Sequence, residues 1–361
     1  MVIFGLMKYK VKNIIALLLI PQIIVVKWLG GHPEFIERYY SKGIYPIISG
    51  FWRILLGWVP FSVGDILYLL LIVMTIGYLI INRASIIKRP LPFFRDIVMV
   101  TSIAYFSFHI LWGFNYYRDP LAKTMGLPQK HDEQDLLDLV DRLVARTNEI
   151  HLQISGDADS MVHIPYTQKE MFDLTLIGYR TLEKEFPLFS YHRPSIKKSL
   201  FSTPLTYMGY GGYLNPFTNE AQANAILPNF RFPVITAHEI GHQLGYSAEN
   251  ETNFIGYLVT VGNGDPYFQY SGYSYALSYC LNELARRDKA LFEERYNRLN
   301  LGIRKNYKEV ADFWEAHKNP LEPIFKSIFN SFLKANNQAQ GIRSYHGVVS
   351  LLVTYYRDRP L

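Results

Sequence analysis

The chain has 361 residues, of which 49% are hydrophobic, yet its mean hydropathy is only +0.01, so strongly apolar segments must be averaged with polar ones. The formal net charge is +6, but Lys and Arg are scattered along the chain, and we expect no nucleic-acid partner. Cys280 is the only cysteine, which excludes an intramolecular disulfide and a cysteine-rich zinc site.

Three apolar segments near the N-terminus are expected to cross a membrane, over about 11–30, 61–81 and 97–117. A helix of about 20 apolar residues is long enough for the roughly 30 Å of hydrocarbon in a bilayer. Between the first two, residues 45–60 are rich in aromatic side chains and include Arg53, which favours an interfacial segment. We therefore expect a membrane region over 1–117, with the lipid bilayer as a partner.

The orientation of these spans follows from the basic residues that flank them, which are Lys8, Lys10 and Lys12 before the first span and Arg83, Lys88, Arg89 and Arg95 between the second and third. Basic flanks stay in the cytoplasm, so three crossings place residues 118–361 outside it. The sequence thus predicts a multi-pass protein of the cell membrane. An alternative is that 1–26 is a cleaved signal peptide, although no A-x-A site follows it.

The remainder of the chain, 118–361, is expected to form an α+β domain that is mostly α. Apolar residues at helical spacing predict a helix near 131–150 and another near 168–186. Further helices are expected over roughly 233–244, 249–261, 270–286, 307–317, 323–335 and 343–356. A short sheet of two or three strands is expected within 196–226, where 215–226 alternates polar and apolar residues as an exposed edge strand does.

The most informative stretch has the pattern HExxH, formed by His238, Glu239 and His242. Histidines four residues apart leave the same face of a helix, so both imidazoles can bind one ion. Neutral imidazoles suit Zn²⁺, and a carboxylate that is not itself a ligand can act as general base. The alternative without a metal is a pair of surface histidines on an amphipathic helix. Against it, Gly245 is suited to end that helix, and the acidic residues Glu249 and Glu251 follow closely.

A catalytic zinc needs a third protein ligand, and the sequence offers Glu249 or Glu251. Asn253 lies four residues after Glu249, on the same helical face, where it could orient a metal-bound side chain. This spacing favours Glu249 as the third ligand, with Glu251 as the alternative. Acidic residues are also common at helix N-termini without any metal, because they suit the helix dipole.

At these residues the chain resembles the gluzincin branch of HExxH zinc metallopeptidases, whose second motif reads E-x-x-A-[D/N]. Here the motif runs from Glu249 to Asn253, with Thr252 where Ala is usual. Ala248 stands where a metzincin would have its third histidine, which argues against that branch. The whole chain also resembles a family of uncharacterised bacterial membrane proteins with about three N-terminal spans and a C-terminal HExxH domain. The resemblance implies a zincin-like metallopeptidase domain and leaves the substrate open.

The expected activity is hydrolysis of peptide bonds in a peptide or protein substrate, with Zn²⁺ as cofactor and Glu239 as general base. Candidate donors to the oxyanion are Tyr345, His346 and Tyr257, of which Tyr345 is preferred. An extended substrate could add to the expected edge strand near 219–225. Two alternatives remain: a zinc-binding membrane scaffold without activity, and an intramembrane protease, against which the polar surroundings of the motif argue.

Overall fold

The structure is a computed structural model that describes residues 9–128, 132–338 and 347–361. The chain forms two compact units. The first unit comprises Met1–Arg118 and Asn215–Glu220, and the second comprises Asp119–Leu214 and Ala221–Leu361. The short segment 215–220 therefore belongs to the first unit although the chain on both sides of it belongs to the second.

The first unit is helical, and three stretches in the described part of the chain are long and apolar enough to cross a membrane: Tyr9–Gly30, Val63–Lys88 and Pro90–Leu111. This composition indicates association with a membrane. The helices of this unit are α2 (Tyr9–Leu17), α3 (Leu19–Gly30), α4 (Pro33–Phe35), the π-helix η1 (Ile36–Ile44), α5 (Tyr45–Leu56), α6 (Val63–Lys88), α7 (Pro90–Leu111) and the 3₁₀-helix η2 (Gly113–Tyr117).

The second and third spans differ from the sequence expectation at their ends. Helix α6 continues to Lys88 and α7 already begins at Pro90, whose fixed φ and missing N–H suit the first turn of a new helix. Three of the four basic residues expected in a loop therefore lie on helices, and Arg89 alone joins them. The third span ends at Leu111, and the aromatic residues after it form η2.

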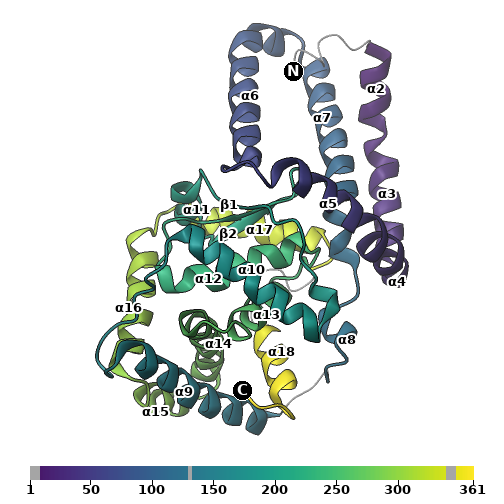
Figure 1. The fold of residues 1–361 in the computed structure, drawn as a ribbon. Helices are drawn as coiled ribbons and strands as arrows, with labels where there is room; N and C mark the ends of the chain where they lie inside the picture. Colours follow the sequence, from purple (N-terminus) through teal and green to yellow (C-terminus); the bar gives the residue numbers. More distant parts are fainter. Residues whose placement is uncertain (1–8, 129–131, 339–346) are drawn as a thin grey trace. The chain divides into compact units, whose positions relative to one another are not determined.

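Polar residues inside the apolar segments of the first unit pair with one another. Lys12 forms an ion pair with Asp96 at 3.2 Å, and the Gln22 amide donates to the Ser102 hydroxyl at 3.2 Å. Both pairs join the N-terminal helices α2 and α3 to α7, and Figure 1 shows these helices side by side. A hydrogen bond between side chains offsets part of the cost of placing an amide in an apolar segment.

The second unit is mostly helical with a small sheet. Helices α9 and α10 begin with capping boxes, Asp132 with Asp135 and Thr167 with Glu170, in which each side chain accepts a backbone N–H that has no partner within the helix. The helices are α8 (Leu121–Thr124), α9 (Glu133–Ser155), α10 (Gln168–Glu185), η3 (Pro187–Phe189), α11 (Ser202–Met208), η4 (Asn229–Arg231), α12 (Phe232–Gln243), α13 (Glu249–Val261), α14 (Pro266–Arg287), α15 (Lys289–Asn297), α16 (Leu301–Ala316), α17 (Glu322–Ala335) and α18 (Gly347–Tyr356).

The sheet has three strands in the order β1-β3-β2, with bounds Ile196–Lys198, Glu220–Ala223 and Gly212–Asn215 respectively. Strand β3 pairs in parallel with β1, and backbone hydrogen bonds link Asn224 to Gly211 and Asn219 to Asn215 on the side of β2. The residue numbers in these two bonds run in opposite directions, so β2 and β3 form an antiparallel hairpin.

The expectation of an exposed edge strand over 215–226 is wrong. The only strand in that stretch is β3, which is the central strand and is buried at all four of its residues. Its polar side chains are internal: the Glu220 carboxylate accepts the backbone N–H groups of Val63 and Gly64 at 3.1 and 2.6 Å. Alternation of polar and apolar residues indicated exposure because such remote partners are invisible in the sequence. The edge strand on this side of the sheet is β2, which is half-buried at Gly212 to Leu214.

Helix α12, which carries the HExxH residues, lies inside the second unit, with the sheet on one side and α14 on the other (Figure 1). It packs most extensively on α13. The helix ends at Gln243, and Gly245 then adopts φ +88°, a left-handed conformation that favours glycine and satisfies the last carbonyls of the helix. The sharp reversal expected at Gly245 is therefore present, and it turns the chain directly into α13.

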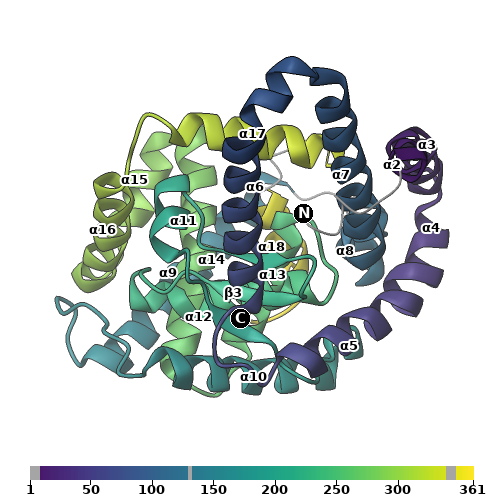
Figure 2. The same ribbon diagram turned by 90° about the horizontal axis from the view of Figure 1, so that it is seen from above.

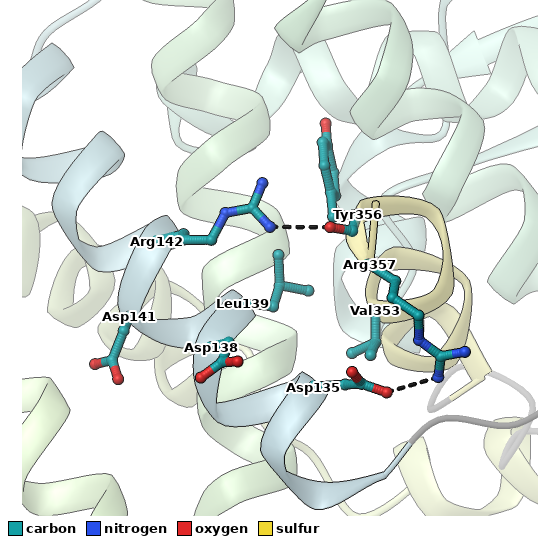
Figure 3. Close-up of a pocket in the computed structure, with 8 residues that line it drawn as sticks. All are labelled: Asp135, Asp138, Leu139, Asp141, Arg142, Val353, Tyr356 and Arg357. Carbon is teal, nitrogen blue, oxygen red and sulfur yellow. Dashed lines mark hydrogen bonds and ion pairs between the residues drawn. The ribbon is translucent and has the colours of Figure 1, made fainter. Parts of the chain in front are cut away.

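The C-terminal helix α18 is fixed to α9 around a surface pocket of the second unit (Figure 3). Arg142 donates to the backbone carbonyls of Tyr356 and Arg359 at 2.9 and 2.6 Å, and Arg357 pairs with Asp135 at 2.6 Å. Asp135, Arg142 and Arg357 are thus engaged in holding the end of the chain, whereas Asp141 pairs with Arg295 and Arg298. None of the HExxH residues lines the pocket.

Candidate metal centre

The two histidines of the motif point their Nε2 atoms at each other across one turn of α12. These atoms lie 3.1 Å apart, and both side chains are buried. The Glu249 carboxylate from the start of α13 completes the cluster, with one oxygen 3.3 Å from His238 Nε2 and the other 3.7 Å from His242 Nε2. Two imidazole nitrogens and a carboxylate therefore converge on one point.

The opposite side of each ring fixes its tautomer. His238 Nδ1 lies 2.8 Å from the side-chain oxygen of Asn253, and His242 Nδ1 lies 2.8 Å from the backbone carbonyl of Tyr246. Both partners are acceptors, so each Nδ1 carries a proton, and each neutral ring then presents an unprotonated Nε2. Two lone pairs and a carboxylate facing one another in a buried site repel unless a cation lies between them.

Charge interactions within the cluster shift its protonation equilibria in the metal-free protein. Burial alone lowers the pKa of His242, but the charge and hydrogen bond of Glu249 outweigh burial and raise that pKa to about 9. Burial raises the pKa of Glu249, but the positive charge of His242 lowers the same pKa by a larger amount. The pKa of Glu249 therefore lies well below its ordinary value. With this raised pKa His242 carries a proton near neutral pH, and a metal ion would have to displace that proton in order to bind its Nε2 atom.

Glu239 lies beside the cluster, and its Oε2 atom has no hydrogen-bond partner among the described residues. One ligand atom of each of His238, Glu239 and His242 lies within 4.8 Å of the others. Glu239 Oε2 is buried without a hydrogen-bond partner, and burial raises the pKa of this carboxyl to about 7 although both histidines lower it. Of Glu239 and Glu249, Glu249 is the better candidate for the third ligand, because its two oxygens contact both imidazoles. Glu239 remains free to exchange a proton with a bound molecule.

The edge strand β2 passes close to Glu239, and a glycine in this strand makes the close approach possible. A Cβ atom built on Gly212 of β2 would lie 2.6 Å from Glu239 Oε1 and 2.6 Å from the backbone oxygen of Gln222. Only glycine fits there without displacing one of these groups. The Glu239 carboxylate therefore lies directly against the backbone of β2.

The remaining predicted site residues lie in different surroundings. The Glu251 carboxylate is buried and accepts the backbone N–H of Leu121 at 2.6 Å, so that it is directed to the start of α8. The Tyr257 hydroxyl donates to Tyr356 at 2.8 Å and is buried in the core, away from the cluster. Tyr345 and His346 lie outside the described residues.

The sequence reasoning assigned no role to two groups that lie close to the candidate ligands. The Tyr275 hydroxyl of α14 donates to the Asn253 oxygen at 2.7 Å, which holds that oxygen in place for His238. Thr252, which replaces the usual Ala, places its hydroxyl oxygen 3.5 Å from His238 Nε2 while it donates to backbone carbonyls of its own helix. No spacing rule connects Tyr275 with Asn253, which is 22 residues away, but the position of Thr252 was visible in the motif.

Comparison with family models gives one match, a family described as "Protein of unknown function (DUF3810)", over residues 40–353. The chain belongs to the DUF3810 family. The match covers most of both units and includes every residue of the candidate metal centre. Comparisons with curated proteins and with solved structures each found no match.

Proposed function

We propose that this membrane protein is a zinc-dependent peptidase whose metal is held by His238, His242 and Glu249. The observation that carries the proposal is the convergence of the two Nε2 atoms, 3.1 Å apart, with a carboxylate that contacts both. Two histidines and one glutamate form a donor set known for catalytic zinc, which keeps a further position open for water or substrate. The site fits the zincin-like domain expected from the motif.

A zinc ion bound there supplies Lewis acidity, which polarises a carbonyl group and makes a neighbouring water more acidic. Glu239 accepts the proton of the attacking water and passes it to the amine that leaves when the peptide bond breaks. Its burial and its unpartnered Oε2 suit a group that takes up and returns one proton. Asn253 and Tyr275 orient His238 during these steps.

The substrate in this proposal is an extended peptide that pairs with strand β2. This strand is an edge of the sheet, its residues Gly212 to Leu214 are only half-buried, and it runs past the Glu239 carboxylate. Backbone pairing with an edge strand would hold a peptide without fixing its side chains. Strand β3, which the sequence suggested for this role, is already paired on both sides.

A Glu239→Gln variant of the full-length protein tests the general base. We expect it to retain zinc and to cleave a peptide library roughly 10² to 10⁴ times more slowly than the wild type, because the amide cannot accept the proton. Glu293→Gln, on the exposed surface of α15, is the matched control and should cleave normally. Equal cleavage by Glu239→Gln and wild type would refute the role of Glu239 as general base. A zinc-loaded wild type that cleaves no peptide would refute the peptidase proposal and favour the alternative of a zinc-binding scaffold without activity.

We further propose that the second unit lies outside the cytoplasm, because the basic residues near the ends of the candidate spans favour cytoplasmic flanks. Fusions of a reporter to Leu361 test this orientation. Alkaline phosphatase, which is active only after export, should be active there, and a green fluorescent protein should be dark when exported through the Sec pathway. The reverse pattern would overturn the orientation.

A further inference from the structure

Helix α17 is the least embedded long helix in the described part of the second unit. Of its 14 residues, Leu333 is the only one that is buried. Figure 2 shows α17 along the outer edge of this unit, where it follows α16. Such a helix gains little from the core of its own domain, and most helices are stable in water only when an apolar face is covered.

Part of the exposed side of α17 is an apolar stripe. Four large side chains at helical spacing, Leu321, Ile324, Ile328 and Phe332, are exposed by 56, 54, 62 and 39%. Successive members are three or four residues apart, so they form one stripe along the helix. Ser327 and Ser331 lie on one flank of the stripe, and Lys326 and Lys334 lie further round the helix.

Two neighbouring side chains extend this stripe. Tyr207 of α11 is exposed by 45%, and its backbone carbonyl accepts the side-chain amide of Asn319 just before α17. Leu200, before α11, is also exposed. Among the described residues of the second unit, ten large hydrophobic side chains are exposed, and six of them belong to α17, its preceding residue Leu321, or this stretch around α11. The exposed apolar surface of the unit is therefore concentrated in one place.

We propose that this face of α17 and α11 lies in the interface of the lipid bilayer that holds the first unit. The three candidate spans keep a bilayer within reach of the second unit at all times, so an apolar stripe there has a permanent apolar partner. The stripe consists of aliphatic side chains and one Phe, with Tyr207 beside it, which is the composition of a helix lying at the headgroup level. Lys334 can extend its ammonium group to the aqueous side, and Lys326 forms an ion pair with Glu322 away from the stripe.

Fluorescence quenching by lipid tests this placement in the full-length protein. The protein is reconstituted in nanodiscs of phosphatidylcholine and phosphatidylglycerol, with an NBD label on Ile324→Cys or Ile328→Cys. The native Cys280 is fully buried and should not react. Lys289→Cys on α15 and Lys308→Cys on α16, whose side chains are 84 and 73% exposed, are the matched controls.

We expect emission from positions 324 and 328 to shift to shorter wavelength and to be quenched several-fold more by spin-labelled phospholipid than emission from positions 289 and 308. Equal quenching at all four positions would overturn the proposal. A shift to shorter wavelength without quenching by lipid would also overturn it, since a second copy or another protein would then cover the face. Metal binding and cleavage do not enter this measurement, so its failure would leave the peptidase proposal untouched.

Discussion

His238 and His242 are held by acceptors of different kinds. His242 donates to the backbone carbonyl of Tyr246, which the turn at Gly245 places one helical turn further on. His238 donates to a side chain, Asn253, whose oxygen also receives the Tyr275 hydroxyl. A backbone acceptor cannot be removed by substitution, whereas a side-chain acceptor can. The orientation of His238 is therefore the part of the centre most open to test.

Replacing Asn253 with Leu removes the acceptor for His238 Nδ1 and keeps the number and branching of the side-chain heavy atoms. We expect zinc affinity to fall by about 10- to 100-fold, the usual effect of losing the group that orients a metal-binding histidine. Competition with a fluorescent zinc chelator measures this affinity.

Asn253→Asp is the matched control. It keeps an oxygen at the same position, so it should bind zinc about as tightly as the wild type. Tyr275→Phe removes only the hydroxyl that holds this oxygen and should give a smaller loss than Asn253→Leu. Unchanged affinity in Asn253→Leu would show that His238 needs no such support.

Most of the candidate metal centre could be predicted at the residue scale. The four-residue spacing of His238 and His242 fixes a common helical face, and the same rule connects Glu249 with Asn253. The two groups that contact Asn253 and His242 from elsewhere, the Tyr275 hydroxyl and the Tyr246 carbonyl, depend on how α14 packs and on where α12 ends. Local periodicity contains no information about the first of these.

At the scale of elements, the centre depends on the close crossing of α12 and α13. A Cβ atom on Gly256 of α13 would lie 2.8 Å from the Val234 carbonyl oxygen of α12. The absence of a side chain there lets the two helices approach closely, with Glu249 and Asn253 facing α12. The sequence predicted both helices to within a few residues. It did not predict α11 or the central position of β3, because the polar side chains of β3 are buried and Glu220 bonds residues more than 150 positions away.

The contact between β2 and α12 provides the prediction for this scale. A Gly212→Ala variant places a methyl group against Glu239 and the Gln222 backbone, and it should retain zinc while cleavage falls by roughly 10²-fold, the effect expected when a catalytic group is displaced by about 1 Å. Steady-state kinetics with a metal assay on the same sample separates the two effects.

The neighbouring glycine offers a control on the same chain. A Cβ atom on Gly211 would lie 3.4 Å from Ile235, an ordinary contact, so Gly211→Ala should keep most of the activity. Equal effects of the two substitutions would indicate a general disturbance of the sheet rather than displacement of Glu239.

At the scale of the whole molecule, the strongly apolar segments and the HExxH motif lie in different parts of the chain. The apolar segments before residue 112 form the three candidate spans, and the motif lies on α12, which is not one of them in the described part of the chain. The sequence could not show that 215–220, between two strands of the sheet, belongs with the first unit. That assignment rests on contacts such as Glu220 with Gly64 and Asn219 with Tyr45, which join positions far apart in sequence.

The metal ligands themselves are tested most directly by X-ray absorption at the zinc edge, recorded on the purified full-length protein after incubation with zinc. We expect one ion per chain with two imidazole nitrogens at about 2.0 to 2.1 Å, additional oxygen ligands and no sulfur. His242→Ala and Glu249→Gln should lose the ion, and Glu251→Gln should keep it, because Glu251 is directed to Leu121. A wild type that binds no ion, or one whose spectrum is the same in His242→Ala, would contradict the account.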